Sequence, residues 1–266
     1  MKYDFEIVEL DARTAVEFIQ DRHYSKVMPK LTKHYLGIYD TMDEHNLAGV
    51  LTLGWGTQPY NTIHKLFPTL ESKDYYEIGK MCMDDSYPRN SETQMLSKVF
   101  KWFKLNCPEK KFLYTWADGI VGKVGYVYQA FNFWYGGYIW TDVYIGPDGE
   151  KIHPRSTRAL LRENEEWEGK EKLFWLTHPF TEYKGIKRIK GKQFRYILPL
   201  NREASKLMET STVKWNKDYP KEDALQWKIK TGFRQYEPLE SMPWFDLSVV
   251  NINTANVNSH KELVCA

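Results

Sequence analysis

A single aspartate, Asp118, lies at the end of an expected strand, where its carboxylate could take part in catalysis. The run before it, Lys111-Phe-Leu-Tyr-Thr-Trp116, is typical of a buried strand, and Gly119 and Gly122 follow it. Open α/β folds place their chemistry at the carboxyl ends of strands, where glycines let the backbone approach a ligand. Asp118 is therefore the leading catalytic candidate; the alternative is an aspartate that only forms the turn before Gly119.

His23 and Tyr24 are a second candidate pair, because they stand where the first expected helix ends beneath the sheet and both would face a cleft. Histidine titrates near neutrality, which suits it to accept a proton from an amine or to bind a metal ion. A structural role for a lone histidine remains the alternative. Glu77, within an expected strand, is a weaker candidate for a base.

The stretch Tyr183–Arg195 holds six basic residues and no acidic residue. Its glycines permit close approach and aromatic residues flank it, which suits the phosphate backbone of DNA. The alternative is an ordinary solvated charged face. Arg155 and Arg158 would extend this patch. The candidate backbone-binding residues are Lys184, Lys187, Arg188, Lys190, Lys192 and Arg195.

Alternating strands and helices must position these side chains. The expected strands are residues 3–10, 35–39, 47–53, 75–83, 111–116, 138–144 and 194–200. The expected helices are 12–22, 90–106, 124–134 with its end at Gly136-Gly137, 156–167 and 221–230, whereas 59–72 is expected to be a loop. This order predicts an α/β (α+β) fold, in which helices cover both faces of a mixed central sheet.

The bulk composition sets limits on the class of protein. The 266 residues carry a net charge of only +2, so a nucleic-acid contact must come from a local patch. The three cysteines have neither disulfide nor zinc spacing, and no segment has the length of a membrane span. We expect a soluble, cytoplasmic protein with a catalytic domain at 1–200 and a C-terminal extension at 201–266, whose last fifteen or so residues are loose.

The order of elements resembles the GNAT superfamily of acyl-coenzyme-A-dependent N-acetyltransferases. That resemblance implies a cofactor pyrophosphate at the start of the helix that follows the fourth strand, where exposed N–H groups attract anions. The residues at that position are Arg89, Asn90, Ser91, Glu92 and Thr93. Acetyl-CoA or another acyl-CoA is then an expected donor. The superfamily's glycine-containing loop is absent, so an ordinary capped helix is the alternative.

More narrowly, the chain resembles the Mom family of phage proteins across residues 5–200. One departure is Lys123, where a histidine is expected between the glycines. The order and spacing of several motifs carry the resemblance. They are Arg22-His-Tyr-Ser25, Pro88-Arg-Asn-Ser-Glu-Thr93, Ala117-Asp-Gly, Gly125-Tyr-Val-Tyr-Gln-Ala-Phe-Asn132, Lys151-Ile-His-Pro-Arg-Ser156 and Gln193-Phe-Arg-Tyr-Ile-Leu198.

The Mom resemblance implies modification of the N6 amine of adenine in phage DNA, which protects that DNA from host restriction enzymes. His23, Tyr24, Asp118 and Tyr128 become the catalytic candidates. Tyr128 would protonate a leaving group, and the alternative is a core tyrosine at helical spacing. Gln129 and Asn132 carry amides that suit the edge of adenine, and Trp134 or Trp55 would stack on an extruded base.

The expected partners are DNA and a small-molecule group donor, with no membrane. A carbamoylmethyl product contains an N–CH2 bond rather than an amide, so a donor other than acyl-CoA, or a redox metal such as iron, stays open. Two other functions remain. One is a conventional acetyltransferase acting on a small amine, a protein or a hypermodified base; the other is a non-catalytic scaffold that binds DNA or blocks a host defence protein.

Overall fold

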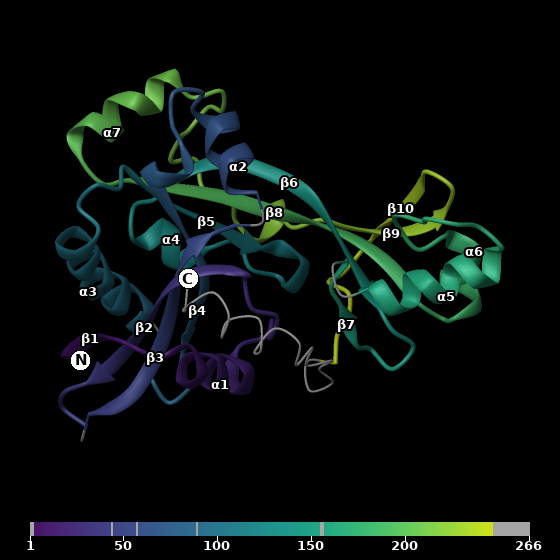
Figure 1. Ribbon diagram of the computed structural model, residues 1–266, viewed down its shortest axis with the longest axis horizontal. Coiled ribbons are helices and arrows are strands. Elements are labelled where there is room, and N and C mark those ends of the chain that lie inside the picture. The colour runs from purple at the N-terminus through teal and green to yellow at the C-terminus, as the bar shows by residue number, and fades with distance from the viewer. Residues whose placement is uncertain (1–2, 44, 57, 89, 155–156, 247–266) are drawn as a thin grey trace.

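One mixed sheet organises the computed structural model, which describes residues 3–43, 45–56, 58–88, 90–154 and 157–246. Its strands lie in the order β1-β2-β3-β4-β5-β8-β6-β7, and β9 pairs with both β8 and β10 (Figure 1). The strands are β1 (Phe5–Glu9), β2 (Leu31–Asp40), β3 (Asn46–Trp55), β4 (Tyr75–Met83), β5 (Phe112–Asp118), β6 (Trp134–Ile145), β7 (Lys151–Ile152), β8 (Lys187–Pro199), β9 (Trp227–Gly232) and β10 (Gln235–Leu239).

Helices cover both faces of this sheet, which confirms the predicted fold class. Tyr35 of β2 packs in a cluster with α1, whereas the next residue, Leu36, packs in a cluster with α3. Since neighbouring strand residues point to opposite faces, α1 and α3 lie on opposite sides. The helices are α1 (Ala12–Arg22), α2 (Pro59–Leu66), α3 (Ser91–Asn106), α4 (Tyr126–Ala130), α5 (Arg158–Glu168), α6 (His178–Tyr183) and α7 (Arg202–Leu207).

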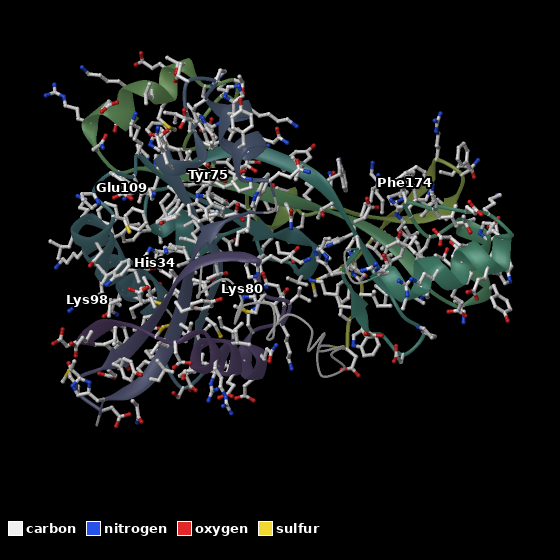
Figure 2. All side chains as sticks on the ribbon, in the orientation of Figure 1. His34, Tyr75, Lys80, Lys98, Glu109 and Phe174 are labelled. Atoms are coloured by element: carbon white, nitrogen blue, oxygen red, sulfur yellow. The ribbon has the colours of Figure 1, made fainter. Side chains whose placement is uncertain are left out.

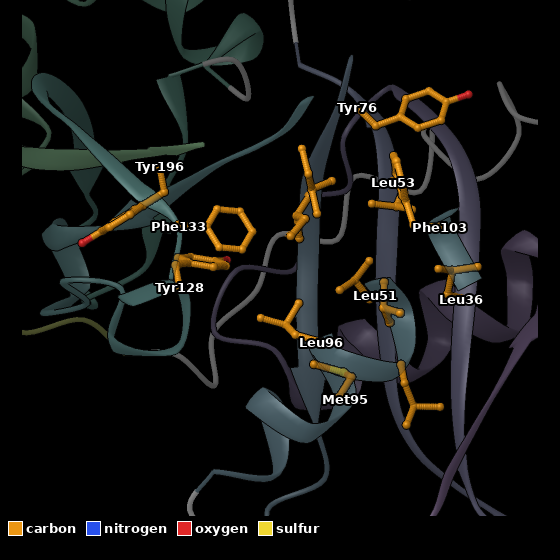
Figure 3. Packing of buried hydrophobic residues seen from close by; sticks show 14 of the residues in the cluster. Leu36, Leu51, Leu53, Tyr76, Met95, Leu96, Phe103, Tyr128, Phe133 and Tyr196 are labelled. Atoms are coloured by element: carbon orange, nitrogen blue, oxygen red, sulfur yellow. The ribbon is translucent and has the colours of Figure 1, made fainter. Parts of the chain in front are cut away.

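The largest core lies between the sheet and the helices α3 and α4. Figure 3 shows leucines of β2 and β3 opposite Met95 and Leu96 of α3, with Tyr128, Phe133 and Tyr196 grouped to one side. Tyr196 and Phe133 are fully buried, and the centres of their rings lie 5.6 Å and 5.4 Å from that of Tyr128. This core therefore fixes α4 and the end of β5, the segment that carries Asp118.

The sheet splits between β4 and β5. These two strands are parallel, unlike the other strand pairs of the described chain, and their register runs only from Tyr75–Phe112 to Glu77–Tyr114. A register shift against β3 follows at Gly79, and beyond it β4 and β5 no longer pair. The Thr115 hydroxyl donates to the Ile78 carbonyl at 3.4 Å, so a side chain bridges the start of the gap.

The strands β6 and β8 extend past the end of β5 and form an arm with β7, α5, α6, β9 and β10 (Figure 1). The two long strands pair antiparallel from Trp134–Ile197 to Ile145–Lys187. At the arm's tip, Tyr144 packs with apolar residues of α6 and the loop before it, Leu176 and Phe180. The arm therefore has its own small cores while it shares strands with the body.

Three local predictions were wrong. Residues 59–72 contain α2, which Pro59 starts and whose Ile63 and Leu66 are buried. The aromatic stretch is helical only from Tyr126 to Ala130, because Asn132 takes a left-handed conformation (φ 61°) and β6 begins at Trp134.

Gly136-Gly137 consequently forms a bulge in β6 rather than a helix end. The third misprediction is 221–230, which forms a short turn followed by β9 rather than a helix, because this segment pairs with Ile189 and its neighbours in β8.

The C-terminal extension packs directly onto the body. Ala204 and Trp215 belong to the same buried cluster as Phe112 of β5, so residue 200 does not separate two cores. The expected loose end, from about residue 252, lies outside the described residues, as do Arg89 and Arg155. Within the described ranges no helix is both long and apolar enough to cross a membrane.

Gly125 should be far less tolerant of substitution than Gly137. Both have positive φ (89° and 79°), but an added Cβ at Gly125 would lie 2.7 Å from Tyr196, whereas one at Gly137 meets no atom within 4 Å. We expect Gly137→Ala to lower the free energy of unfolding by about 1–2 kcal/mol, the cost of the left-handed conformation. Gly125→Ala should cost about 3 kcal/mol, because overpacking adds to that strain. Urea denaturation of both variants measures the difference, and equal losses would contradict this account of the core.

Candidate active site

The residues after α1 bring an imidazole and a phenol to the open side of the split. The helix ends when the His23 amide donates to the Ile19 carbonyl at 2.8 Å. The rings of His23 and Tyr24 then stack with centroids 4.3 Å apart. The backbone N–H of Ser25 donates to His23 Nδ1 at 2.9 Å. The same Nδ1 also lies 3.0 Å from the carbonyl oxygen of Ser25, so the Ser25 backbone fixes the position of the imidazole.

A buried lysine, Lys80 of β4, lies beside this segment (Figure 2). Its Nζ donates to the carbonyl of Ser25 at 2.7 Å and to the Ser25 hydroxyl at 2.9 Å. Both acceptors are neutral, so neither compensates a full charge as a carboxylate would. Burial, followed by the positive charge of Lys151, lowers the pKa of Lys80 to about 7. Lys80 can therefore hold or release a proton near neutral pH.

Asp118 ends β5 on the other side of the split. Its Oδ1 accepts the Ile120 amide at 3.2 Å, which orients the carboxylate, and its Oδ2 lies 3.2 Å from Lys151 Nζ. The side chains of Asp118 and Lys151 are largely shielded from solvent. Lys151 Nζ also lies 5.5 Å from the centre of the Tyr24 ring. This lysine of β7 thus connects the arm to both sides of the site.

Burial and the surrounding lysines set the protonation states. Burial lowers the pKa of His23 to about 3, and the charges of Lys80, Lys151 and Lys123 add to that effect. Burial raises the pKa of Tyr24, and the nearby Asp118 carboxylate raises it further. At neutral pH the imidazole is therefore uncharged and the phenol keeps its proton.

The four predicted catalytic residues form one group. Tyr128 is buried on α4, and its electrostatic interaction with Tyr24 contributes to the raised pKa of that phenol. Burial also raises the pKa of Tyr128, which leaves it a proton donor. Glu77 lies close enough to Tyr128 to raise its pKa slightly further. We name the group His23, Tyr24, Lys80, Asp118, Tyr128 and Lys151 the split-end cluster.

Sequence reasoning missed the two lysines of this cluster. Lys80 lies within the expected strand Tyr75–Met83, where a lone cation in a run of buried apolar residues is itself a signal. Lys151 was noticed only within its motif. Its role depends on β7 pairing with β6 at Ile145, a contact that the sequence alone does not reveal.

The two predicted base-binding amides have different surroundings. The Gln129 nitrogen lies 3.0 Å from both the Tyr196 hydroxyl and the Pro220 carbonyl, and its oxygen accepts from Lys221 at 3.2 Å. This buried amide is therefore engaged by the protein, which argues against a role in reading a base. Asn132 is exposed at the turn after α4.

The expected pyrophosphate site at the start of α3 is only partly described, because Arg89 lies outside the described residues. Asn90 precedes the helix in a left-handed conformation (φ 75°), and its side chain makes no capping bond. Ser91 is buried, and Glu92 places a carboxylate in the first turn. A carboxylate there opposes the binding of a second anion, so the described residues do not by themselves favour a pyrophosphate.

The predicted DNA-backbone residues divide between the two faces of β8. Arg188, Lys190 and Lys192 alternate along one face, whereas Lys187 and Arg195 point to the other. Lys184, in the turn after α6, forms an ion pair with Glu163.

Several of these cations have protein partners. Arg188 Nε lies 3.0 Å from Asp142, and Lys192, almost fully buried, donates to the Ala224 carbonyl at 2.9 Å. Arg195 stacks over Trp116 at 5.1 Å. The described residues contain no group of three or more His, Cys, Asp or Glu side chains placed to hold a metal ion.

Comparison with known proteins places this arrangement in a family. The model of the Mom protein family matches residues 4–221. The chain belongs to the Mom protein family. It is 30% identical over 207 residues to the methylcarbamoylase Mom of Escherichia phage Mu, an alignment that covers 76% of this chain and 78% of that protein.

Solved acetyltransferases resemble the fold at low identity. A GNAT family N-acetyltransferase from Escherichia coli, in complex with CoA, has 14% identity and a TM-score of 0.35 over 50% of this chain and 70% of that one. A ribosomal-protein-S5-alanine acetyltransferase from Vibrio fischeri has 8% identity and a TM-score of 0.41 over 76% and 97%.

The environment of His23 predicts an unusual titration. We expect its imidazole to stay unprotonated from pH 8 to pH 5, so that its NMR signals do not reach the chemical shifts of an imidazolium, because its pKa lies near 3. Lys80→Met removes a neighbouring positive charge and should raise the His23 pKa, whereas Lys33→Met, which removes an exposed lysine, should not. Protonation of the wild-type imidazole near pH 6.5 would contradict the buried, cationic environment.

Proposed function

We propose that this protein transfers a small group, of the carbamoylmethyl or acyl type, to the N6 amine of adenine in DNA. Membership of the Mom family supports a transferase of this kind, since the relative from phage Mu is named a methylcarbamoylase. The observation that carries the proposal is the split-end cluster, where a lysine that can be neutral near pH 7 lies close to a fixed carboxylate and protonated phenols. In a phage genome, such a modification would protect the DNA from restriction.

Asp118 is suited to hold the substrate amine. Its orientation is fixed by the Ile120 amide and by Lys151, and a carboxylate has further lone pairs that can accept an N6 hydrogen. That hydrogen bond places electron density on the amine nitrogen, whose lone pair is otherwise delocalised into the purine ring. Asp118 would therefore both position and activate the amine.

Lys80 is a better proton acceptor than His23. A group with a pKa near 3 binds a proton too weakly to draw one from an amine, whereas a pKa of about 7 matches neutral conditions. As the new bond forms at N6, the displaced proton passes to the neutral Lys80. Tyr24 or Tyr128, both still protonated, donates a proton to the departing group. His23 then serves to orient Tyr24 through ring stacking.

The bond formed at N6 distinguishes the two possible classes of donor. Transfer of a carbamoylmethyl group, –CH2–CO–NH2, to nitrogen forms an N–CH2 bond, whereas acyl-CoA would give an amide. Glu92 in the first turn of α3 disfavours a pyrophosphate there, so no step above depends on coenzyme A or on a metal ion. The roles of Asp118, Lys80 and the tyrosines apply to either donor.

Loss of Asp118 should abolish the modification without unfolding the protein. We expect DNA from bacteria that express the wild-type chain to release a new adenosine species on digestion, detected by mass spectrometry, and Asp118→Ala cells to lack it. Asp218→Ala, which removes an exposed carboxylate elsewhere, should retain it. A soluble Asp118→Ala protein that still modifies DNA would refute this role. No new species from any variant would direct attention to another substrate.

Activity should depend on the protonation of Lys80. We expect kcat to rise about tenfold per pH unit below about pH 7 and to level off above it, because the lysine must be neutral to accept a proton. Lys80→Met should lower kcat by about 10²- to 10⁴-fold and remove this pH dependence. His23→Gln should keep it. Persistence of the pH dependence in Lys80→Met would assign the titrating group elsewhere.

A further inference from the structure

One side of the arm's sheet gathers lysines and aromatic rings from four strands. The register places Trp140 opposite Lys192, Lys190 opposite Lys228, and Tyr236 opposite Lys230, so these side chains share a face. Tyr138, two residues before Trp140, points the same way. We name this surface the arm face: Tyr138, Trp140, Lys190, Lys192, Lys228, Lys230 and Tyr236.

The two sides of the arm's sheet differ in kind. On the far side, Val143, Ile145, Ile189 and Ile229 pack with Ile120 and form an apolar core. On the arm face, Tyr138 remains 46% exposed, and most of the other side chains are half-buried rather than covered. The arm face is therefore the solvent side of this part of the sheet.

The arm face carries more lysines than the carboxylates on the same strands can neutralise. Among the described strand residues that share this face, Asp142 is the carboxylate, and Arg188 already pairs with it at 3.0 Å. Lys230 lies near enough to Lys190 and Arg188, and Lys192 to Lys228, for each pair to repel. A polyanion would relieve this repulsion.

Three of these four lysines each lie over an aromatic ring of the same face. Lys190 Nζ lies 4.3 Å from the centre of the Tyr236 ring, and Lys228 Nζ lies 4.6 Å from that of Trp140. Lys192 Nζ lies 4.3 Å from the Tyr138 ring. Rings that hold a cation over their faces can instead stack a nucleobase while the flexible lysine moves to a phosphate.

We infer that the arm face binds an unpaired strand of DNA, with phosphates on Lys190, Lys228 and Lys230 and bases stacked on Trp140, Tyr138 or Tyr236. A duplex would satisfy the lysines but keeps its bases stacked inside, where these rings cannot reach them. This assignment rests on the proposed function in one respect, namely that the nucleic acid is DNA.

The arm face contacts DNA away from the reacting base. Asp118 lies opposite Gln193, whose side chain points to the other side of β8 from Lys192 and Lys190. The bound segment is thus a flank of the target nucleotide or its displaced partner strand. The match to the Mom family model ends at residue 221, before β9 and β10, so this hairpin and its two lysines extend the chain beyond the matched region.

Fluorescence anisotropy with dye-labelled oligonucleotides tests the arm face. We expect the full-length protein to bind single-stranded DNA at least tenfold more tightly than a duplex of the same length at low salt. Lys228→Glu/Lys230→Glu should weaken binding to the single strand by tenfold or more and flatten its salt dependence, since fewer counterions are released. Trp140→Ala should lower the affinity for single-stranded DNA about tenfold and leave its salt dependence unchanged, because the substitution removes stacking rather than charge.

The matched control is Lys101→Glu/Lys206→Glu, which makes the same change in net charge at exposed positions on α3 and α7. It should bind within about twofold of the wild type. Equal binding of duplex and single strand, tighter binding of RNA than DNA, or equal losses in both double variants would overturn the inference.

Nucleoside mass spectrometry separates this inference from the proposed function. If the wild type binds single strands through the arm face but makes no modified adenosine, the proposed function fails alone. If Lys228→Glu/Lys230→Glu binds and modifies DNA normally, the inference about the arm face is refuted while the proposed function stands.

Discussion

The short parallel contact between β4 and β5 is the constraint on which the site depends. Three residue pairs hold the two strands together, and the register shift at Gly79 then lets them separate. Because both strands keep antiparallel neighbours on their outer sides, the sheet survives the split without losing its order. The split places Lys80 and Asp118 on two sides of one opening, where the segment after α1 can deliver His23 and Tyr24.

The elements of this fold were largely predictable, because their signals are local. Helix α1 begins where it was expected, after Asp11, whose carboxylate accepts the Thr14 amide at 3.0 Å, and most strands lie where apolar runs predict them. The failures have tertiary causes. Residues 124–134 look like one aromatic helix, yet Phe133 turns into the core and Trp134 starts a strand that pairs with Ile197. No periodicity within the segment reveals that partner.

The site was predictable in part for the same reason. Asp118, His23 and Tyr24 stand at the ends of recognisable elements, where functional side chains are expected. Lys80 owes its character to burial and to two acceptors on Ser25, which is 55 residues away in the chain. Gln129 is the converse case. Its amide has the chemistry to bind a nucleobase, but its nitrogen is already hydrogen-bonded to Tyr196 and Pro220. Sequence can nominate a functional group, but its partners decide whether that group is available.

The pairing of β9 with β8 also covers a strand edge that would otherwise be exposed. On one side of β8, β5 pairs only as far as Gln193, and β9 continues along Gly191 to Ile189. Without the hairpin, that length of β8 would present unpaired backbone groups at an open edge, a template for another chain to add a strand. Residues 227–239 therefore cover this edge, and we expect a fragment trimmed to residues 4–221 to self-associate.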